Sequence, residues 1–365
     1  MGKASKEKKG LIFWDTDLRR ELIHTFLTRL TRLSSTTIDA LRILGTFPFL
    51  VQRGKYLGID WEQTFRNWSK PSSDDEADRQ ENALRMVKDA ICAYEPLDSH
   101  SVKFIPQGSY NNNTNVRQES DVDICVCCTS PYFVDFSQAN YGWVQGEIDS
   151  PYTFYNFKND VEAALRKKFG IDGYARGSKA FNVHPNGYRV HADVVAAFEY
   201  REYLRGCIDP VTGLAAASYT LPEGTKFICD GSFKSIINWP EQHHDKGVSK
   251  NLRTGNRFKY IVRALKRLKY YMAENGKPDL KDFPSYLIEC LVYCVPDSYF
   301  EGDSYYDNVH TVLAHAISGT IKAEGCCDWL EVNEKKVLFD AGQPWTHKAA
   351  CDFCVAAWNT VGFGN

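Results

Sequence analysis

Two aspartates one residue apart, Asp121 and Asp123, are the side chains of this chain best suited to chemistry. They open the apolar stretch DVDICVCC, which predicts a strand over 121–128. Side chains at positions i and i+2 of a strand share one face, and two carboxylates on one face repel each other unless a cation lies between them. Because Mg²⁺ prefers oxygen ligands, the pair predicts a site for a metal ion and a triphosphate.

A third acid, Asp193, lies in the stretch YRVHADVVAAF, which predicts another strand. An acid in an apolar strand is costly unless it faces something positive. A strand beside the first would present all three acids to two metal ions about 3.5–4 Å apart, the arrangement that clamps both oxygens of a phosphoryl transfer. We therefore expect Asp121, Asp123 and Asp193 to be catalytic residues and metal ligands, with Mg²⁺ as the cofactor and Mn²⁺ as a substitute.

A nucleotide-binding turn is predicted just before the acids, at Gln107, Gly108 and Ser109, where a strand over 102–106 ends. Glycine allows close approach of a ligand to the backbone, and free N–H groups with a serine hydroxyl can hold phosphate oxygens. Strand, turn and acids in this order favour nucleotide chemistry. The alternatives are that Gly-Ser followed by Asp-x-Asp occurs here by chance, or that the two aspartates bind calcium or lie on a solvated strand edge.

The surrounding pattern predicts elements that can position these residues. Apolar periodicity indicates a long helix over 74–94 and another over 154–169, and strands over 175–184 and 188–198 joined by a Pro-Asn-Gly turn. Residues 206–250 are rich in Gly, Pro and Asp and predict a loop between two lobes. The remaining pattern is helical, over 256–275, 285–295, 304–319 and 345–359.

This order predicts an α+β fold with an all-helical lobe at its C-terminal side. We expect an N-terminal helical extension over 1–66, a catalytic lobe over 67–235 and a C-terminal helical lobe over 236–365. Within the extension, apolar residues recur at helical spacing between residues 10 and 56.

The charge and composition of the chain indicate which classes of binding partner to expect. The net charge of the 365 residues is −2, whereas dedicated nucleic-acid binders carry a strong basic excess. A basic segment over 246–269 suits a small polyanion such as a triphosphate, with a solvated helix face as the alternative. The 12 cysteines are dispersed, and we see neither a signal peptide nor an apolar run long enough for a membrane, so we expect reduced thiols and a cytoplasmic location.

Zinc is the competing metal. Five side chains near the C-terminus could supply ligands: Cys326, Cys327, His347, Cys351 and Cys354. Their spacing fits no usual pair-of-pairs motif, and cysteines buried in helices are common, so we do not expect a zinc site.

The residues Gly108-Ser109, Asp121-Val-Asp123 and Asp193 together resemble the signature of polymerase-β-like nucleotidyltransferases. Three further stretches indicate a particular subgroup of this superfamily. They are WSKPSSDDEADRQ, then KNLRTGNRFKYIVRALKRLK followed by FPSYLIECL, and the tail from WLEVNEKKVLFDAGQPW onward. From about residue 68 to the end the chain looks like the cGAS/DncV-like nucleotidyltransferases of bacterial anti-phage systems. That resemblance implies a mixed sheet with a long spine helix, a C-terminal helical lobe and an active site in the cleft between them.

The resemblance also implies roles in the second lobe and beside the acids. Lys266 and Ser285 would contact the triphosphate, Tyr286 would stack on a base, and Asn182 would read an incoming base. A lysine suits phosphate as a point charge and an aromatic face accepts any base. A solvated Lys266 and a core-packing Tyr286 are the alternatives.

The predicted activity joins nucleoside triphosphates into a cyclic di- or trinucleotide messenger with release of pyrophosphate, in defence against phage. Ring closure follows from the resemblance alone. The alternatives are transfer to another acceptor, such as an RNA 3′ end, a protein or a small molecule, and a silent nucleotide-binding scaffold. A regulatory protein or ligand is a possible partner, whereas activation by long double-stranded nucleic acid is not expected. The bases used, linkage, ring size, activating signal and oligomeric state cannot be predicted from the sequence.

Overall fold

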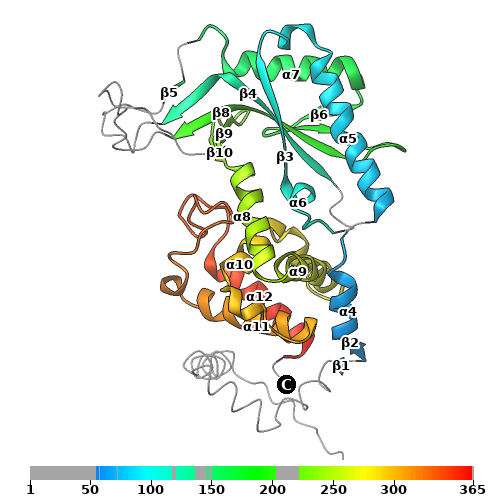
Figure 1. Ribbon diagram of the computed structural model, residues 1–365, viewed down its shortest axis with the longest axis vertical. Coiled ribbons are helices and arrows are strands. Elements are labelled where there is room, and N and C mark those ends of the chain that lie inside the picture. The colour runs from blue at the N-terminus through cyan, green and yellow to red at the C-terminus, as the bar shows by residue number, and fades with distance from the viewer. Residues whose placement is uncertain are drawn as a thin grey trace, which may run out of the picture.

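The computed structural model describes residues 55–56, 58–71, 73–116, 121–135, 146–147, 150–202 and 222–363. These residues form a lobe built on a sheet and, below it in Figure 1, a lobe built of helices. The helix predicted within 10–56 lies outside the described residues except for its end, where β1 (Lys55–Tyr56) pairs with β2 (Ile59–Asp60).

The upper lobe is one sheet with two long helices. Its central path has the order β10-β9-β8-β4-β3, and β4 and β8 are parallel whereas the other pairs are antiparallel. A short hairpin of β6 and β7 joins β8, and β5 joins β4. In chain order the elements are α5 (Asp74–Cys92), η2 (Glu95–Leu97), β3 (Ser101–Gln107), α6 (Gly108–Asn111), β4 (Val122–Asp135), β5 (Gly146–Glu147), α7 (Phe154–Phe169), β6 (Tyr174–Arg176), β7 (Phe181–Val183), β8 (Ala192–Glu202), β9 (Gly224–Ile228) and β10 (Ser235–Asn238).

The two parallel strands form the centre of this lobe. Parallel strands are usually covered on both faces and read as continuous apolar runs, as β4 and β8 do. Helices α5 and α7 pack against them and against each other, as Figure 1 shows, and their apolar faces complete the core. The start of α7 is fixed by a capping box between Thr153 and Asn156. The apolar runs therefore hold the strand ends, where the acids lie, on a rigid base.

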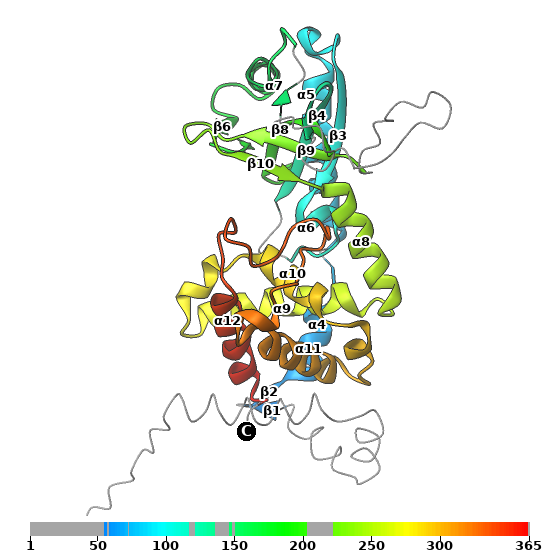
Figure 2. The same cartoon turned by 90° about the vertical axis from the view of Figure 1, so that its left-hand side faces the viewer.

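The lower lobe is all helical and has a core of its own. Its elements are α4 (Trp61–Trp68), α8 (Pro240–Arg253), α9 (Arg257–Glu274), η3 (Pro278–Asp282), α10 (Ser285–Cys294), η4 (Asp297–Phe300), α11 (Tyr305–Thr320), η5 (Ala323–Gly325) and α12 (His347–Val361). Helix α4 precedes the sheet in the chain, yet its Trp61 and Phe65 are buried in this core. We therefore propose that the helical lobe combines 61–68 with the segment from 240 onward, which moves α4 out of the predicted N-terminal extension. Figure 2 shows α8 running from the sheet into this lobe.

The loop predicted over 206–250 is wrong in its described part, which contains β9, β10 and α8. Helix α8 has little apolar periodicity because its buried positions are Pro240, His243, Gly247 and Lys250, and such residues give no hydrophobic signal. The strand predicted over 175–184 is instead the β6–β7 hairpin. The helices predicted from 256 onward are confirmed within one or two residues at each end. No helix in the described ranges is long and apolar enough to cross a bilayer.

Candidate active site

The three predicted acids lie at one end of the sheet. Asp123 is in register with Asp193 across the parallel pair of β4 and β8, so the two side chains share a face. Asp121 directly precedes β4 and is exposed, with 62% of its side-chain surface accessible. Nδ1 of His191 lies 3.7 Å from Oδ1 of Asp121 and 3.7 Å from Oδ1 of Asp193. The structure therefore brings the acids together, with His191 between two of them.

The predicted phosphate-binding turn lies directly against Asp123. Gln107, the last residue of β3, is in register with Asp123, and Gly108 and Ser109 begin the short helix α6. Gly108 has a φ of +70°, and a Cβ atom built on it would lie 1.8 Å from Oδ2 of Asp123. Only glycine tolerates both the left-handed backbone and the carboxylate at this place. The turn and the acid are therefore packed as one unit.

Asn182 is a direct partner of Asp193. The two residues are in register across β7 and β8, and Nδ2 of Asn182 donates a hydrogen bond of 2.5 Å to Oδ1 of Asp193. The other oxygen, Oδ2, accepts no hydrogen bond within the residues that the structure describes. Asn182 was predicted to read a base, and the structure places its amide on the acid. An amide donor of this kind orients a carboxylate and leaves its second oxygen for a ligand.

The donor set suits a hard cation. Three carboxylates on neighbouring strand ends offer the oxygen ligands that Mg²⁺ prefers, and a buried His191 nitrogen beside them has no hydrogen-bond partner among the described residues. The three acids are near one another, but their carboxylates do not converge on one point. In the described part of the chain, no three His, Cys, Asp or Glu side chains are close enough together to hold an ion. The same holds for the C-terminal cysteines Cys326, Cys327, Cys351 and Cys354, which lie in the described part and carry free thiols.

In the helical lobe, Ser285 forms a hydrogen bond with Lys269, a lysine that was not among the predicted site residues. Lys269 donates from Nζ to Oγ of Ser285 at 2.8 Å and to the carbonyl oxygen of Phe283 at 3.2 Å. Lys266 is 1% exposed, and its Nζ lies 3.8 Å from Oε2 of Glu289. The structure therefore places the ammonium group of Lys269 on the hydroxyl of Ser285. The two lysines are one turn apart on α9, so helical spacing alone could not distinguish them.

Tyr286 is partly buried between two rings. Its centroid lies 5.5 Å from that of His243 and 5.9 Å from that of Trp345, and its hydroxyl donates to Oε2 of Glu331 at 2.8 Å. Burial, followed by the nearby Cys290 and Glu331, raises the pKa of Tyr286 well above its ordinary value. The ring is therefore held firmly in one orientation.

The basic segment over 246–269 is mostly interior rather than a basic surface. Five of its members are buried: Lys250, Lys259, Arg263, Lys266 and Lys269. Two more pair with acids, Lys246 with Glu334 and Arg253 with Asp297. A solvated helix face is therefore wrong for the five buried residues. A role for the segment in binding a triphosphate stays a prediction.

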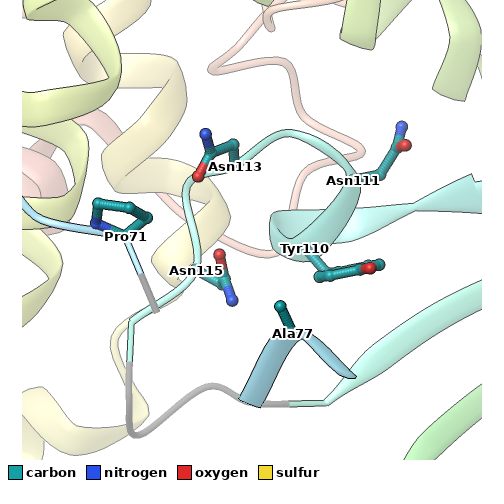
Figure 3. A pocket seen from close by; sticks show the side chains of 6 residues that line it. All are labelled: Pro71, Ala77, Tyr110, Asn111, Asn113 and Asn115. Carbon is teal, nitrogen blue, oxygen red and sulfur yellow. The ribbon is translucent and has the colours of Figure 1, made fainter. Parts of the chain in front are cut away.

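A cavity of about 350 Å³ adjoins the turn. Figure 3 shows its lining from the segment that begins with α6, from the start of α5 and from the chain before it: Pro71, Ala77, Tyr110, Asn111, Asn113 and Asn115. None of the predicted site residues lines it. The cavity is therefore a neighbour of the reactive centre and not the centre itself.

Comparison with known proteins decides the family. Residues 245–362 match the family described as the cGAS/DncV-like nucleotidyltransferase C-terminal helical domain. The cyclic dipyrimidine nucleotide synthase CdnE of Legionella pneumophila is 46% identical over 321 residues, which cover 84% of this chain and 99% of that protein. The chain belongs to the cGAS/DncV-like nucleotidyltransferases. It is a nucleotidyltransferase of the kind that makes cyclic oligonucleotides.

Further relatives support the α+β fold predicted for this nucleotidyltransferase. The cyclic dipyrimidine nucleotide synthase CdnE of Cecembia lonarensis is 34% identical over 303 residues, covering 83% of this chain and 98% of that protein. The structure of the Elizabethkingia meningoseptica CdnE cyclic dinucleotide synthase with GTP and Apcpp has a TM-score of 0.65 at 32% identity, covering 82% of this chain and 98% of that one. Enzymes of this family use a divalent metal for catalysis.

Proposed function

We propose that this nucleotidyltransferase joins two pyrimidine nucleoside triphosphates into a cyclic dinucleotide and releases pyrophosphate. The observation that carries the chemistry is the register of Asp123 with Asp193, with Gly108 beneath the carboxylate of Asp123. The names of the Legionella and Cecembia relatives, at 46% and 34% identity, support pyrimidines over purines. Base choice varies among relatives, since a protein 31% identical is named a cyclic dipurine nucleotide synthase.

The three acids are the residues we assign to the metal. Asp121, Asp123 and Asp193 would hold Mg²⁺, which neutralises phosphate charge and acidifies the attacking hydroxyl when bound. Because their strand ends are adjacent, we expect side-chain rotations to gather the carboxylates. Asn182 keeps Oδ1 of Asp193 engaged and directs Oδ2 to the ligand side.

The chain's own part in the reaction is to position two nucleotides. A ribose hydroxyl of the acceptor forms a bond to the α-phosphorus of the donor, the bond from that phosphorus to the bridging oxygen breaks, and pyrophosphate leaves. Oδ2 of Asp193 orients the hydroxyl and takes its proton. Ser109 and the backbone of the turn hold the donor triphosphate, so that the reacting atoms are aligned. A second round of the same displacement closes the ring.

From the helical lobe we assign Lys269 and Ser285 to the triphosphate. Their hydrogen bond supports this assignment, because it places an ammonium group and a hydroxyl side by side, where both could contact the same phosphate. Lys266 then has an internal role through Glu289. Tyr286, held by Glu331, remains our candidate for stacking on a base.

A nucleotide assay tests this proposal. The purified protein is incubated with Mg²⁺ and each α-labelled triphosphate, alone and in pairs, then treated with phosphatase and separated by chromatography. We expect a phosphatase-resistant product from UTP or CTP. A product that needs purine triphosphates would contradict the base assignment. Label that enters only an added RNA, protein or small molecule would favour the acceptor-modifying alternative over ring formation.

The setting of this activity is also proposed. We place it in the bacterial cytoplasm, where the triphosphates are, in defence against phage, with a regulatory protein or ligand as the activator. Phage plating on cells that carry the gene with its neighbours tests this, with an Asp123→Asn variant as the control. Equal plaque counts with the two forms would contradict a defensive role.

A further inference from the structure

The segment that follows the phosphate-binding turn is held by the helical lobe at three consecutive residues. Residues 112–114 contact α8, α9 and α10, one helix each. The contacts join Oδ1 of Asn112 to Nδ1 of His244 (3.3 Å), the carbonyl oxygen of Asn113 to Nη1 of Arg263, and Oγ1 of Thr114 to Oε2 of Glu289 (2.7 Å). Three helices therefore fix one short segment of the sheet lobe.

Thr114 connects this segment back to the turn. Its backbone N–H donates to the carbonyl oxygen of Ser109 at 2.9 Å, and its hydroxyl donates to Glu289. The residue is fully buried, so water cannot replace either bond. A displacement of Glu289 would therefore act on Ser109 through a single residue.

Glu289 is equally constrained on its own side. It lies four residues after Ser285 on α10, so the two side chains occupy the same face one turn apart. Its Oε1 lies 3.1 Å from Nε2 of His243, and Nζ of Lys266 lies 3.8 Å from its Oε2. Apolar packing could join two lobes at lower cost than a buried carboxylate, but hydrogen bonds also fix distance and direction.

We propose that Glu289 is a positioning residue that sets the spacing between Ser109 of the sheet lobe and Ser285 of the helical lobe through Thr114. The proposal rests on the function proposed above, in which both serines hold the donor triphosphate. Glu289 itself touches neither serine in this scheme. It keeps the two phosphate-binding groups at a fixed separation, and the donor is gripped from both sides only when the Thr114–Glu289 bond is made.

Three threonine variants test the inference in the full-length protein. Thr114→Val removes the hydroxyl at constant shape, Thr114→Ser keeps it, and Thr320→Val is the matched control. Thr320 is also fully buried, and its hydroxyl donates within α11, to the carbonyl oxygen of Ala316. We expect Thr114→Val to lower kcat/KM for the triphosphates roughly tenfold, the loss of one hydrogen bond to a charged group, while Thr114→Ser and Thr320→Val stay within about twofold.

Amide hydrogen exchange separates this inference from the proposed function, because it needs no turnover. We expect the peptide spanning 108–116 to exchange faster in Thr114→Val than in the wild type, Thr114→Ser or Thr320→Val. Unchanged exchange, or equal loss of activity in Thr114→Val and Thr114→Ser, would overturn the positioning role. If the wild type forms no cyclic product while the exchange difference is present, the proposed function fails and the link between the lobes stands.

Discussion

Asp193 lies directly across from Asp123 in the parallel pair of β4 and β8. Two like charges on one face of a sheet repel each other. The amide of Asn182 donates to Asp193, and His191 lies nearby. A cation between the strands would relieve the repulsion. This relationship supports our proposal that the sheet end binds a divalent metal and phosphate.

Replacing Gly108 by alanine should abolish product formation without unfolding the protein. The new methyl group would meet Oδ2 of Asp123 at 1.8 Å and must push that carboxylate out of place. Gly231→Ala is the matched control, because Gly231 has a similar φ of +78° and its new methyl group would have no atom within 4 Å. Product yield and circular dichroism are measured for both. Activity retained in Gly108→Ala, or lost equally in Gly231→Ala, would contradict the packing argument.

Asn182→Ala distinguishes two roles for this residue. If its amide orients Asp193, kcat should fall roughly tenfold or more for every triphosphate, the usual cost of losing a partner that orients a ligand. If it reads a base, the order of preference among the triphosphates should change while kcat for the best one is kept. We expect the first result. Steady-state rates with each triphosphate decide between them, with the exposed Asn159 changed to alanine as the control.

Substitutions of the two buried lysines on α9 should have different effects. One should weaken triphosphate binding, and the other should lower the stability of the fold. Lys269→Met should raise the KM for the triphosphates roughly tenfold, because it removes the cation beside Ser285. Lys266→Met should leave KM within about threefold and lower the free energy of unfolding by about 2 kcal/mol, since Glu289 keeps His243 as a partner. Kinetics and chemical denaturation measure the two effects. The reverse pattern would restore Lys266 as the phosphate ligand.

The stability of the protein should depend on Glu289 at acid pH. Burial alone would raise its pKa, but the hydrogen bond and charge of His243, the charge of Lys266 and the hydrogen bond from Thr114 outweigh burial and hold the pKa at about 2. The pKa is lower in the folded than in the unfolded state, so the stabilisation is complete above about pH 4.5 and is lost as the pH falls towards 2.

Acid unfolding measures this contribution. Glu289→Gln should be less stable than the wild type at neutral pH, and the difference should shrink between pH 4.5 and 2. A difference that stays constant over this range would mean that Glu289 is not ionised in the folded protein.

The sequence was sufficient to predict where the acids and the turn lie in the fold, and most of the helices. Asp123 lies in β4 with Asp121 directly before it, and Gly108 directly follows β3, so local periodicity placed these residues at the strand ends. The register of Asp123 with Asp193 is a long-range pairing, and only the shared type of residue suggested it. Helix α8 was missed because its buried face carries His243, Gly247 and Lys250, which have no apolar period.

The contacts between the two lobes could not be predicted from local sequence patterns, because they join segments that are far apart in the chain. Thr114, His243 and Glu289 come from three distant segments, and each alone is typical of a surface position. Their burial depends on the docking of one lobe on the other, which no local pattern encodes. The same holds for Lys269, which spacing could not distinguish from its neighbour Lys266.

The most direct test of the account is the dependence of cyclic product on the paired acids. The wild type, Asp123→Asn, Asp193→Asn and the exposed control Asp303→Asn are incubated with labelled triphosphates and Mg²⁺, and the wild type also with a chelator. The account predicts phosphatase-resistant product from the wild type and Asp303→Asn only, and none from either site variant or in chelator, with all four proteins folded. Product from Asp123→Asn or Asp193→Asn at the wild-type level would contradict it.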